Sequence, residues 1–152
     1  MQIELKLDYT EFSKWLSKIS DDMKGKTARS AISAGGFTLE KHIKLNIDKQ
    51  GLRDTGRLIN SVSVGDIKAN ASGYECYVGP RGVIYARIHE FGGTIVPKRA
   101  KMLHWVDKTT GKDVFAMRAV IPARPYMRPA IDENKKEIFD AMITQISKEL
   151  MK

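Results

Sequence analysis

Three histidines and one cysteine are the side chains of this 152-residue chain best suited to metal binding or nucleophilic catalysis. His89-Glu90 begins like a zinc-protease helix, in which a second histidine four residues on brings two imidazoles onto one face. Position 93 is glycine, so that pair is not completed. His42 and His104 have no Asp or Glu at a recurrent ligand spacing. We therefore predict no metal site and no cofactor.

The remaining nucleophiles and loops lack the neighbours that catalysis needs. The serines have no nucleophile-elbow context, and Cys76 lies within a predicted strand, where a thiolate is not favoured. Gly79-Pro80-Arg81-Gly82 lacks the Gly-Lys-Ser/Thr ending of a phosphate-binding loop. The sequence predicts no catalytic residue and a protein that is not an enzyme. A small hydrolase using His89 and Glu90 is the less favoured alternative.

Two other clusters have the composition of a protein interface, which favours exposed aromatic, Met and Arg side chains on stiff segments. One is YARIHEFGG and the other is the proline-stiffened arm IPARPYMRP. In the alternative interpretation, Tyr85 and Phe91 fill the core, and the prolines only hold the chain extended ahead of the last helix. The predicted interface residues are Tyr85, Glu90, Phe91, Arg124, Pro125, Tyr126, Met127 and Arg128.

Charge marks a third region. The chain carries a net charge of +8, and residues 97–128 hold eight basic and two acidic side chains, which is +6 of that total. A polyanion would be attracted to this segment most strongly. Its basic side chains include Lys98, Arg99, Lys101, Lys108 and Lys112. In the alternative interpretation they belong to an ordinary hairpin tip, where lysines discourage edge-to-edge strand pairing.

Hydrophobic spacing predicts the elements that position these clusters. We expect an amphipathic helix over residues 8–23 ended by Gly25, and a second helix over 27–49, in which Gly35-Gly36 requires either a kink or a very close packing partner. Strands are expected at 62–68 and 74–79, with Cys76 and Val78 facing inward. Residues 84–93 are compatible with a short helix but are too few to exclude a strand. The order is completed by a hairpin of 102–107 with 113–122 and a terminal helix beginning at Pro129.

This order predicts an α+β fold, with an antiparallel or mixed sheet of about four strands packed by two N-terminal helices and one long C-terminal helix. We expect a single domain over 1–152 with a basic β-hairpin insertion at about 95–121. A composition of 42% hydrophobic and 29% charged residues is typical of a soluble domain. No apolar run approaches the roughly 20 residues of a membrane span, and no signal peptide is recognised. The single cysteine excludes an internal disulfide.

Three motifs together, DTGRLINS, YARIHEFGG and IPARPYMRPAID, resemble the minor tail or neck proteins of long-tailed bacteriophages. These are also described as tail-completion or head–tail joining proteins, and the virion morphogenesis proteins of transposable phages are related to them. The resemblance runs from about residue 27 to 150. It departs from the family at residues 94–120, where this chain is longer than compact members.

The resemblance implies a structural virion protein that assembles in the bacterial host cytoplasm at the head–tail junction or proximal tail end. It also implies a homo-oligomeric ring, with six copies to match tail symmetry, in contact with neighbouring neck, tail-terminator or tail-tube proteins. In such a ring, we expect the five basic residues to face the DNA channel or an acidic neighbour, without sequence specificity and without a membrane. The alternative is a small nucleic-acid-binding protein using residues 97–128.

Overall fold

The computed structural model describes residues 3–5, 21–71 and 73–151, and the chain divides into two compact units. Unit 1 comprises residues 1–83 and 126–152, and unit 2 comprises residues 84–125. The first predicted helix lies largely outside the described residues. Its expected end at Gly25 and the later predicted elements lie within the described residues.

Helix α2 runs from Asp21 to Lys49 without interruption, so the expected end at Gly25 and new start at residue 27 are wrong. A Cβ at Gly25 would lie 3.0 Å from the Tyr74 hydroxyl oxygen. Glycine at this position accommodates a close neighbour, and its helix-breaking tendency of about 1 kcal/mol does not end a helix with extensive tertiary packing.

The Gly35-Gly36 pair lets α2 be approached closely from two directions. A Cβ at Gly35 would lie 2.9 Å from the sulfur of Met142, and one at Gly36 would lie 3.0 Å from a methyl carbon of Val64. Met142 belongs to helix α6, Lys135–Leu150, and Val64 to strand β2, Val62–Val64. The Gly35-Gly36 pair therefore lets side chains of α6 and β2 pack closely against α2.

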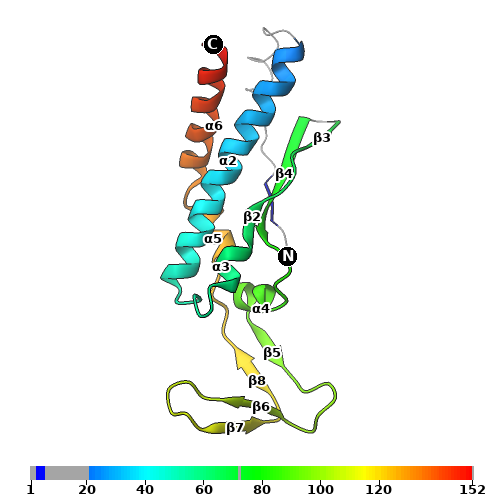
Figure 1. Ribbon diagram of the computed structural model, residues 1–152, viewed down its shortest axis with the longest axis vertical. Coiled ribbons are helices and arrows are strands. Elements are labelled where there is room, and N and C mark those ends of the chain that lie inside the picture. The colour runs from blue at the N-terminus through cyan, green and yellow to red at the C-terminus, as the bar shows by residue number, and fades with distance from the viewer. Residues whose placement is uncertain (1–2, 6–20, 72, 152) are drawn as a thin grey trace. The chain divides into compact units, whose positions relative to one another are not determined.

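Strand β4, Gly73–Pro80, is the centre of the sheet structure in unit 1. It pairs antiparallel with β1 (Ile3–Leu5), β2 and β3 (Lys68–Asn70). The short helix α3, Arg57–Ser61, leads directly into β2. Cys76 and Val78 of β4 are buried, as predicted from strand alternation. Helix α2 packs on β4 and β2, and α6 packs along α2 (Figure 1).

The C-terminal region contains two helices where one was predicted. Helix α5 spans Met127–Asp132, two residues earlier than the expected start at Pro129, and α6 follows at Lys135. Between them the Asn134 side chain donates to the Ala130 carbonyl at 3.0 Å, a local side-chain bond that competes with helix continuation. In α6 the apolar residues Ile138, Met142 and Ile146 recur every four positions and are buried.

Unit 2 contains helix α4 (Ala86–Phe91) and two antiparallel ribbons, β5 (Gly93–Ile95) with β8 (Ala119–Ile121) and β6 (Leu103–Val106) with β7 (Asp113–Ala116). The expected short helix and the hairpin around residues 108–112 are confirmed. The α+β class is also confirmed, but the strands form several small antiparallel sheets instead of one. The β5–β8 pairing was not predicted, because three-residue strands carry too little alternation.

Candidate functional site

The first predicted interface cluster lies on α4, and its side chains differ in exposure. Phe91 is 62% exposed and Tyr85 is 38% exposed, whereas Glu90 is 4% exposed. The Tyr85 ring meets the His89 ring edge to face, with centroids 5.7 Å apart. Two aromatic side chains are thus presented for contact, while Glu90 is buried.

The backbone joins this cluster to the proline arm within unit 2. The Arg124 amide donates to the His89 carbonyl at 2.7 Å, and Gly93 pairs with Ile121 in the β5–β8 ladder. Gly92 has φ 68°, and a Cβ there would lie 2.7 Å from the Ala123 nitrogen. Only glycine fits this approach without moving backbone. Two motifs about 30 residues apart in sequence therefore form one surface.

The arm itself divides between exposed and buried side chains. Arg124, Pro125 and Arg128 are exposed, but Tyr126 and Met127 are both 0% exposed. In unit 1 the Asn46 side chain donates to the Tyr126 carbonyl at 3.1 Å. The expectation that Tyr126 and Met127 are exposed is wrong, because helix α5 begins at Met127 and turns both side chains into the core.

All five basic residues singled out from the sequence are exposed in unit 2. Lys98, Arg99 and Lys101 lie between β5 and β6, and Lys108 and Lys112 flank the turn between β6 and β7. Asp107 organises that turn, since one of its carboxylate oxygens accepts the amides of Thr109 and Thr110 at 2.8 Å each. These two bonds hold the pKa of Asp107 below its ordinary value. The lysines therefore project from a well-ordered turn.

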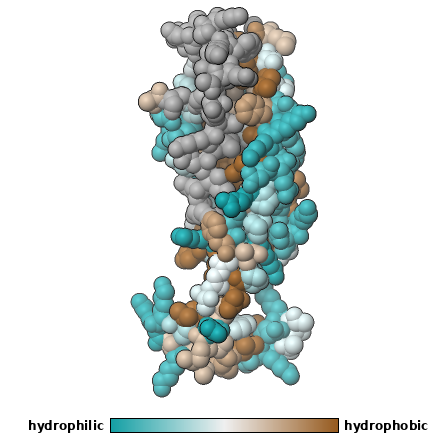
Figure 2. Space-filling model, turned by 180° about the vertical axis from the view of Figure 1, so that it is seen from behind, coloured by the Kyte–Doolittle hydropathy of each residue, from teal (hydrophilic) through white to brown (hydrophobic). Residues whose placement is uncertain are grey.

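Apart from Tyr85 and Phe91, exposed apolar side chains are the feature that the sequence prediction missed in unit 2. Eleven of the sixteen large apolar residues exposed in the described chain belong to residues 84–125. Figure 2 shows hydrophobic and hydrophilic side chains next to one another in the part of the molecule that contains strands β5, β6, β7 and β8. The eleven are Ile84, Tyr85, Phe91, Ile95, Val96, Met102, Trp105, Val106, Phe115, Met117 and Val120. The sequence shows the alternation of DVFAM, residues 113–117, but it does not indicate which face of that strand is covered.

The histidines and the cysteine occupy ordinary structural positions. His42 bonds Glu137 at 2.9 Å, and His104 bonds Asp113 at 2.7 Å. Burial lowers the pKa of His89 below its ordinary value, and the Arg124 guanidinium adds to this effect. Burial also raises the pKa of the Cys76 thiol, which disfavours a nucleophilic thiolate. Within the described ranges, no three His, Cys, Asp or Glu side chains are grouped so that they could hold a metal.

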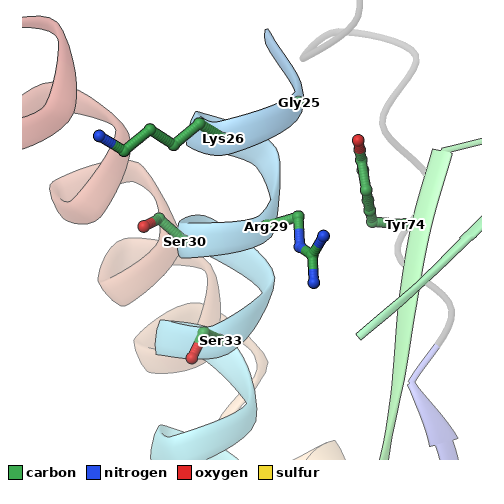
Figure 3. Close-up of a pocket in the computed structure, with 6 residues that line it drawn as sticks. All are labelled: Gly25, Lys26, Arg29, Ser30, Ser33 and Tyr74. Atoms are coloured by element: carbon green, nitrogen blue, oxygen red, sulfur yellow. The ribbon is translucent and has the colours of Figure 1, made fainter. Parts of the chain in front are cut away.

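An open pocket of about 620 Å³ lies in unit 1 between the start of α2 and β4. Figure 3 shows Lys26 and Arg29 leaving α2 in different directions, with Arg29 on the side of Tyr74. The two cations do not converge on one point, so the pocket lacks a paired cationic clamp. Its lining residues are Gly25, Lys26, Arg29, Ser30, Ser33 and Tyr74.

Residues 38–147 match the model of the phage virion morphogenesis family. The chain belongs to this family. The match includes all three sequence motifs, the whole of unit 2 and part of unit 1, so the surface shared by α4 and the arm of unit 2 lies within the part that defines the family. Comparison with curated proteins gives no match, and comparison with solved structures gives none either. No helix among the described residues is long and apolar enough to cross a membrane.

Proposed function

We propose that this virion morphogenesis protein is a structural, non-enzymatic component that assembles at the head–tail junction or the proximal end of the tail. There it completes the tail and joins it to the head. The observation that carries the proposal is the joining of α4 and the arm by the Arg124–His89 backbone bond and the close approach at Gly92. A rigid surface of this kind suits docking, since little conformational entropy is lost on binding.

The proposed contact surface is smaller than the sequence suggested. In unit 2 it consists of Tyr85, Phe91, Arg124 and Pro125, all of which are exposed. Arg128 is also exposed but belongs to unit 1, and it is proposed as a separate contact residue. Glu90, Tyr126 and Met127 are buried, so their side chains are not part of the contact surface. Heterologous contacts of one copy with the next can close into a ring. The proposed number of six copies comes from the family resemblance.

The basic residues of unit 2 are proposed to face either the DNA that passes through such a ring or an acidic neighbour. Lys98, Arg99, Lys101, Lys108 and Lys112 are all exposed, which permits contact with phosphates or carboxylates. DNA contacts of this kind would be weak and independent of sequence. Salt-dependent binding of the purified protein to free duplex would instead favour the nucleic-acid-binding alternative.

The test is complementation of a phage that lacks this gene. The double variant Phe91→Ala/Arg124→Ala is expected to give tailless heads and unjoined tails by electron microscopy, with thermal unfolding close to that of the unmodified protein. The matched control, Phe37→Ala/Arg53→Ala, removes an exposed Phe and an exposed Arg from unit 1. Normal joining by the first variant would overturn the proposed contact surface. Normal virions without the gene product would overturn the proposed function.

A further inference from the structure

One face of the β6–β7 ribbon is exposed along its whole length. In the antiparallel register His104 lies opposite Phe115 and Val106 lies opposite Asp113, so these four side chains share one face. Phe115 is 63% exposed and Val106 is 55% exposed. Met102 and Met117, which adjoin the two strands at their open end, are 49% and 65% exposed. These six residues are called the outer face below.

The opposite face of the ribbon is more covered. Leu103, Val114 and Ala116 are intermediate in exposure, and Trp105 is 40% exposed. The ribbon therefore has an inner side that unit 2 partly covers and an outer side that the described chain leaves open. An isolated two-stranded ribbon is marginally stable in water, so a partner on the open side would stabilise it.

Side-chain contacts hold the outer face in a defined shape. The His104 and Phe115 rings stack, with centroids 4.6 Å apart and an angle of 22° between their planes. The Asp113 carboxylate bonds the same imidazole at 2.7 Å, which fixes the ring from its edge. Such ordering lowers the entropy cost of binding, and exposed Met side chains adapt to an apolar partner.

Cations lie at both ends of the outer face. Lys108 and Lys112 flank the turn at one end, where the Asp113 carboxylate is bonded to His104 and the Asp107 carboxylate to the amides of the turn. Lys101 and Arg118 adjoin the two methionines at the other end, and all four cations are exposed. The ribbon between them is four residue pairs long, which is about 13 Å of strand, and the two pairs His104–Phe115 and Val106–Asp113 lie on the outer face. The complementary ligand is a short segment with apolar side chains at its centre and carboxylates towards its ends.

Charge also discriminates among the possible occupants. Unit 2 holds eight basic and three acidic side chains, a net charge of +5, and the rest of the chain holds 18 and 15, a net charge of +3. A second copy of this chain would therefore bring further positive charge. Duplex DNA would satisfy the cations but would leave Phe115, Val106 and the two methionines against phosphates and water.

We propose that the outer face of the β6–β7 ribbon is a docking site for an acidic, apolar segment of another virion protein. This proposal rests on the proposed function, because it takes the partner from the same particle. It goes beyond that function by assigning the site to residues outside the α4 and arm surface. It also selects an acidic protein over DNA as the ligand of this ribbon.

Photo-crosslinking in infected cells tests the occupant directly. The full-length chain, with benzoylphenylalanine at position 115, replaces the unmodified copy, and the matched control carries the same group at position 37, where Phe37 is 61% exposed on α2. The expected result is a crosslink from position 115 to an acidic, apolar segment of a different virion protein. A crosslink to DNA or to a second copy would overturn the proposal, and so would the lack of any crosslink in virions that contain the chain.

Complementation titres provide a second measurement. Phe115→Ser/Met117→Ser and Lys108→Glu/Lys112→Glu are each expected to lower the titre about tenfold or more, since hot-spot anchors dominate interfaces. Phe37→Ser should stay within about twofold. Thermal unfolding is measured for each variant, and full titres from both folded double variants would overturn the docking site. Mass spectrometry of purified virions separates the two proposals: presence of the chain without position-115 crosslinks overturns only the docking site, whereas its absence counts against the virion role itself.

Discussion

Unit 1 has a core of fully buried large apolar side chains, whereas unit 2 leaves most of its own exposed. In unit 1, Leu39, Ile43, Ile47, Val78 and Tyr126 are all 0% exposed. In unit 2, only Ala86 and Glu90 fall in the buried class. Backbone pairing and local turns therefore order unit 2, while apolar burial stabilises unit 1. A surface rich in uncovered apolar groups is typical of a part that is completed by a partner.

The largest expected contrast is between two aromatic residues. Tyr126→Ala in unit 1 is expected to reduce the free energy of unfolding by about 3–5 kcal/mol, because it removes a fully buried ring and leaves a cavity. Phe115→Ala in unit 2, where the ring is 63% exposed, should change it by about 0.5 kcal/mol or less. Urea unfolding followed by circular dichroism measures both. A comparable loss from both variants would mean that unit 2 has a core of its own.

The next contrast lies within unit 2 and concerns two glycines with nearly equal φ. Gly92→Ala is expected to destabilise the β5–β8 ribbon by about 2–4 kcal/mol, because its φ of 68° and ψ of −178° suit almost only glycine and a Cβ would also clash with the Ala123 and Ile121 backbone. Gly111→Ala has open space around it and should cost only the strain, about 1–2 kcal/mol. Amide hydrogen exchange of residues 93–95 and 119–121 reports the difference. Equal protection in the two variants would contradict the role assigned to the close approach.

Acid is expected to weaken unit 2 through His89. Its folded pKa lies below the ordinary value of 6.5, so the unfolded chain takes up a proton first as the pH falls. Neutral His89 therefore leaves the stability of unit 2 undiminished above about pH 6.5. As the pH falls from 6.5 through the folded pKa, the stability declines. Hydrogen exchange of unit 2 amides between pH 7 and 5 measures this decline. His89→Gln should flatten it, and an unchanged profile in that variant would assign it to another group.

The smallest expected effect comes from the link between α2 and α6 in unit 1. Lys41 donates to one oxygen of Glu137 at 2.8 Å and His42 bonds the other at 2.9 Å. The Lys41 hydrogen bond is the main cause that holds the pKa of Glu137 below its ordinary 4.5, and His42 adds to it. This contribution is present above pH 4.5 and is lost as the pH falls through the folded pKa.

Glu137→Gln is therefore expected to reduce the slope of unit 1 stability against pH only below about pH 4.5. Thermal unfolding from pH 6 to 3 measures the slope. The effect should be small, since the carboxylate is half exposed and surface ion pairs contribute little. A slope below pH 4.5 that is unchanged in this variant would contradict the role assigned to Glu137.

The sequence predicted those elements in which the apolar spacing and the turn residues agreed with the packing found in the structure. The hairpin around residues 108–112 was predicted because its apolar flanks and polar turn agreed. The spacing of Ile84, Ile88 and Phe91 favoured the short helix at Ala86–Phe91 but was too short to exclude a strand. The inward placement of Cys76 and Val78 followed from alternation alone. The three motifs were also sufficient to indicate the family.

Tertiary packing decided the parts that the sequence did not predict. Helix α2 continues through Gly25, where a Cβ would lie 3.0 Å from the Tyr74 hydroxyl oxygen, and that neighbour is 49 residues away. Tyr126 and Met127 have interface composition, yet the start of α5 places them in the core of unit 1. The exposure of Phe115 and Met117 depends on which side of a ribbon is covered, and a two-residue period does not specify the side.

The β5–β8 ladder has an evolutionary consequence. Because Ile95 and Ala119 are paired, the chain between them starts and finishes about 5 Å apart, which is the spacing of neighbouring strands. Doubling the length of such a closed segment costs only about 0.6 kcal/mol of closure entropy. Insertions and replacements there can accumulate without disturbing the helices of unit 1. Residues 96–118 are therefore a segment in which changes of length cost little closure entropy.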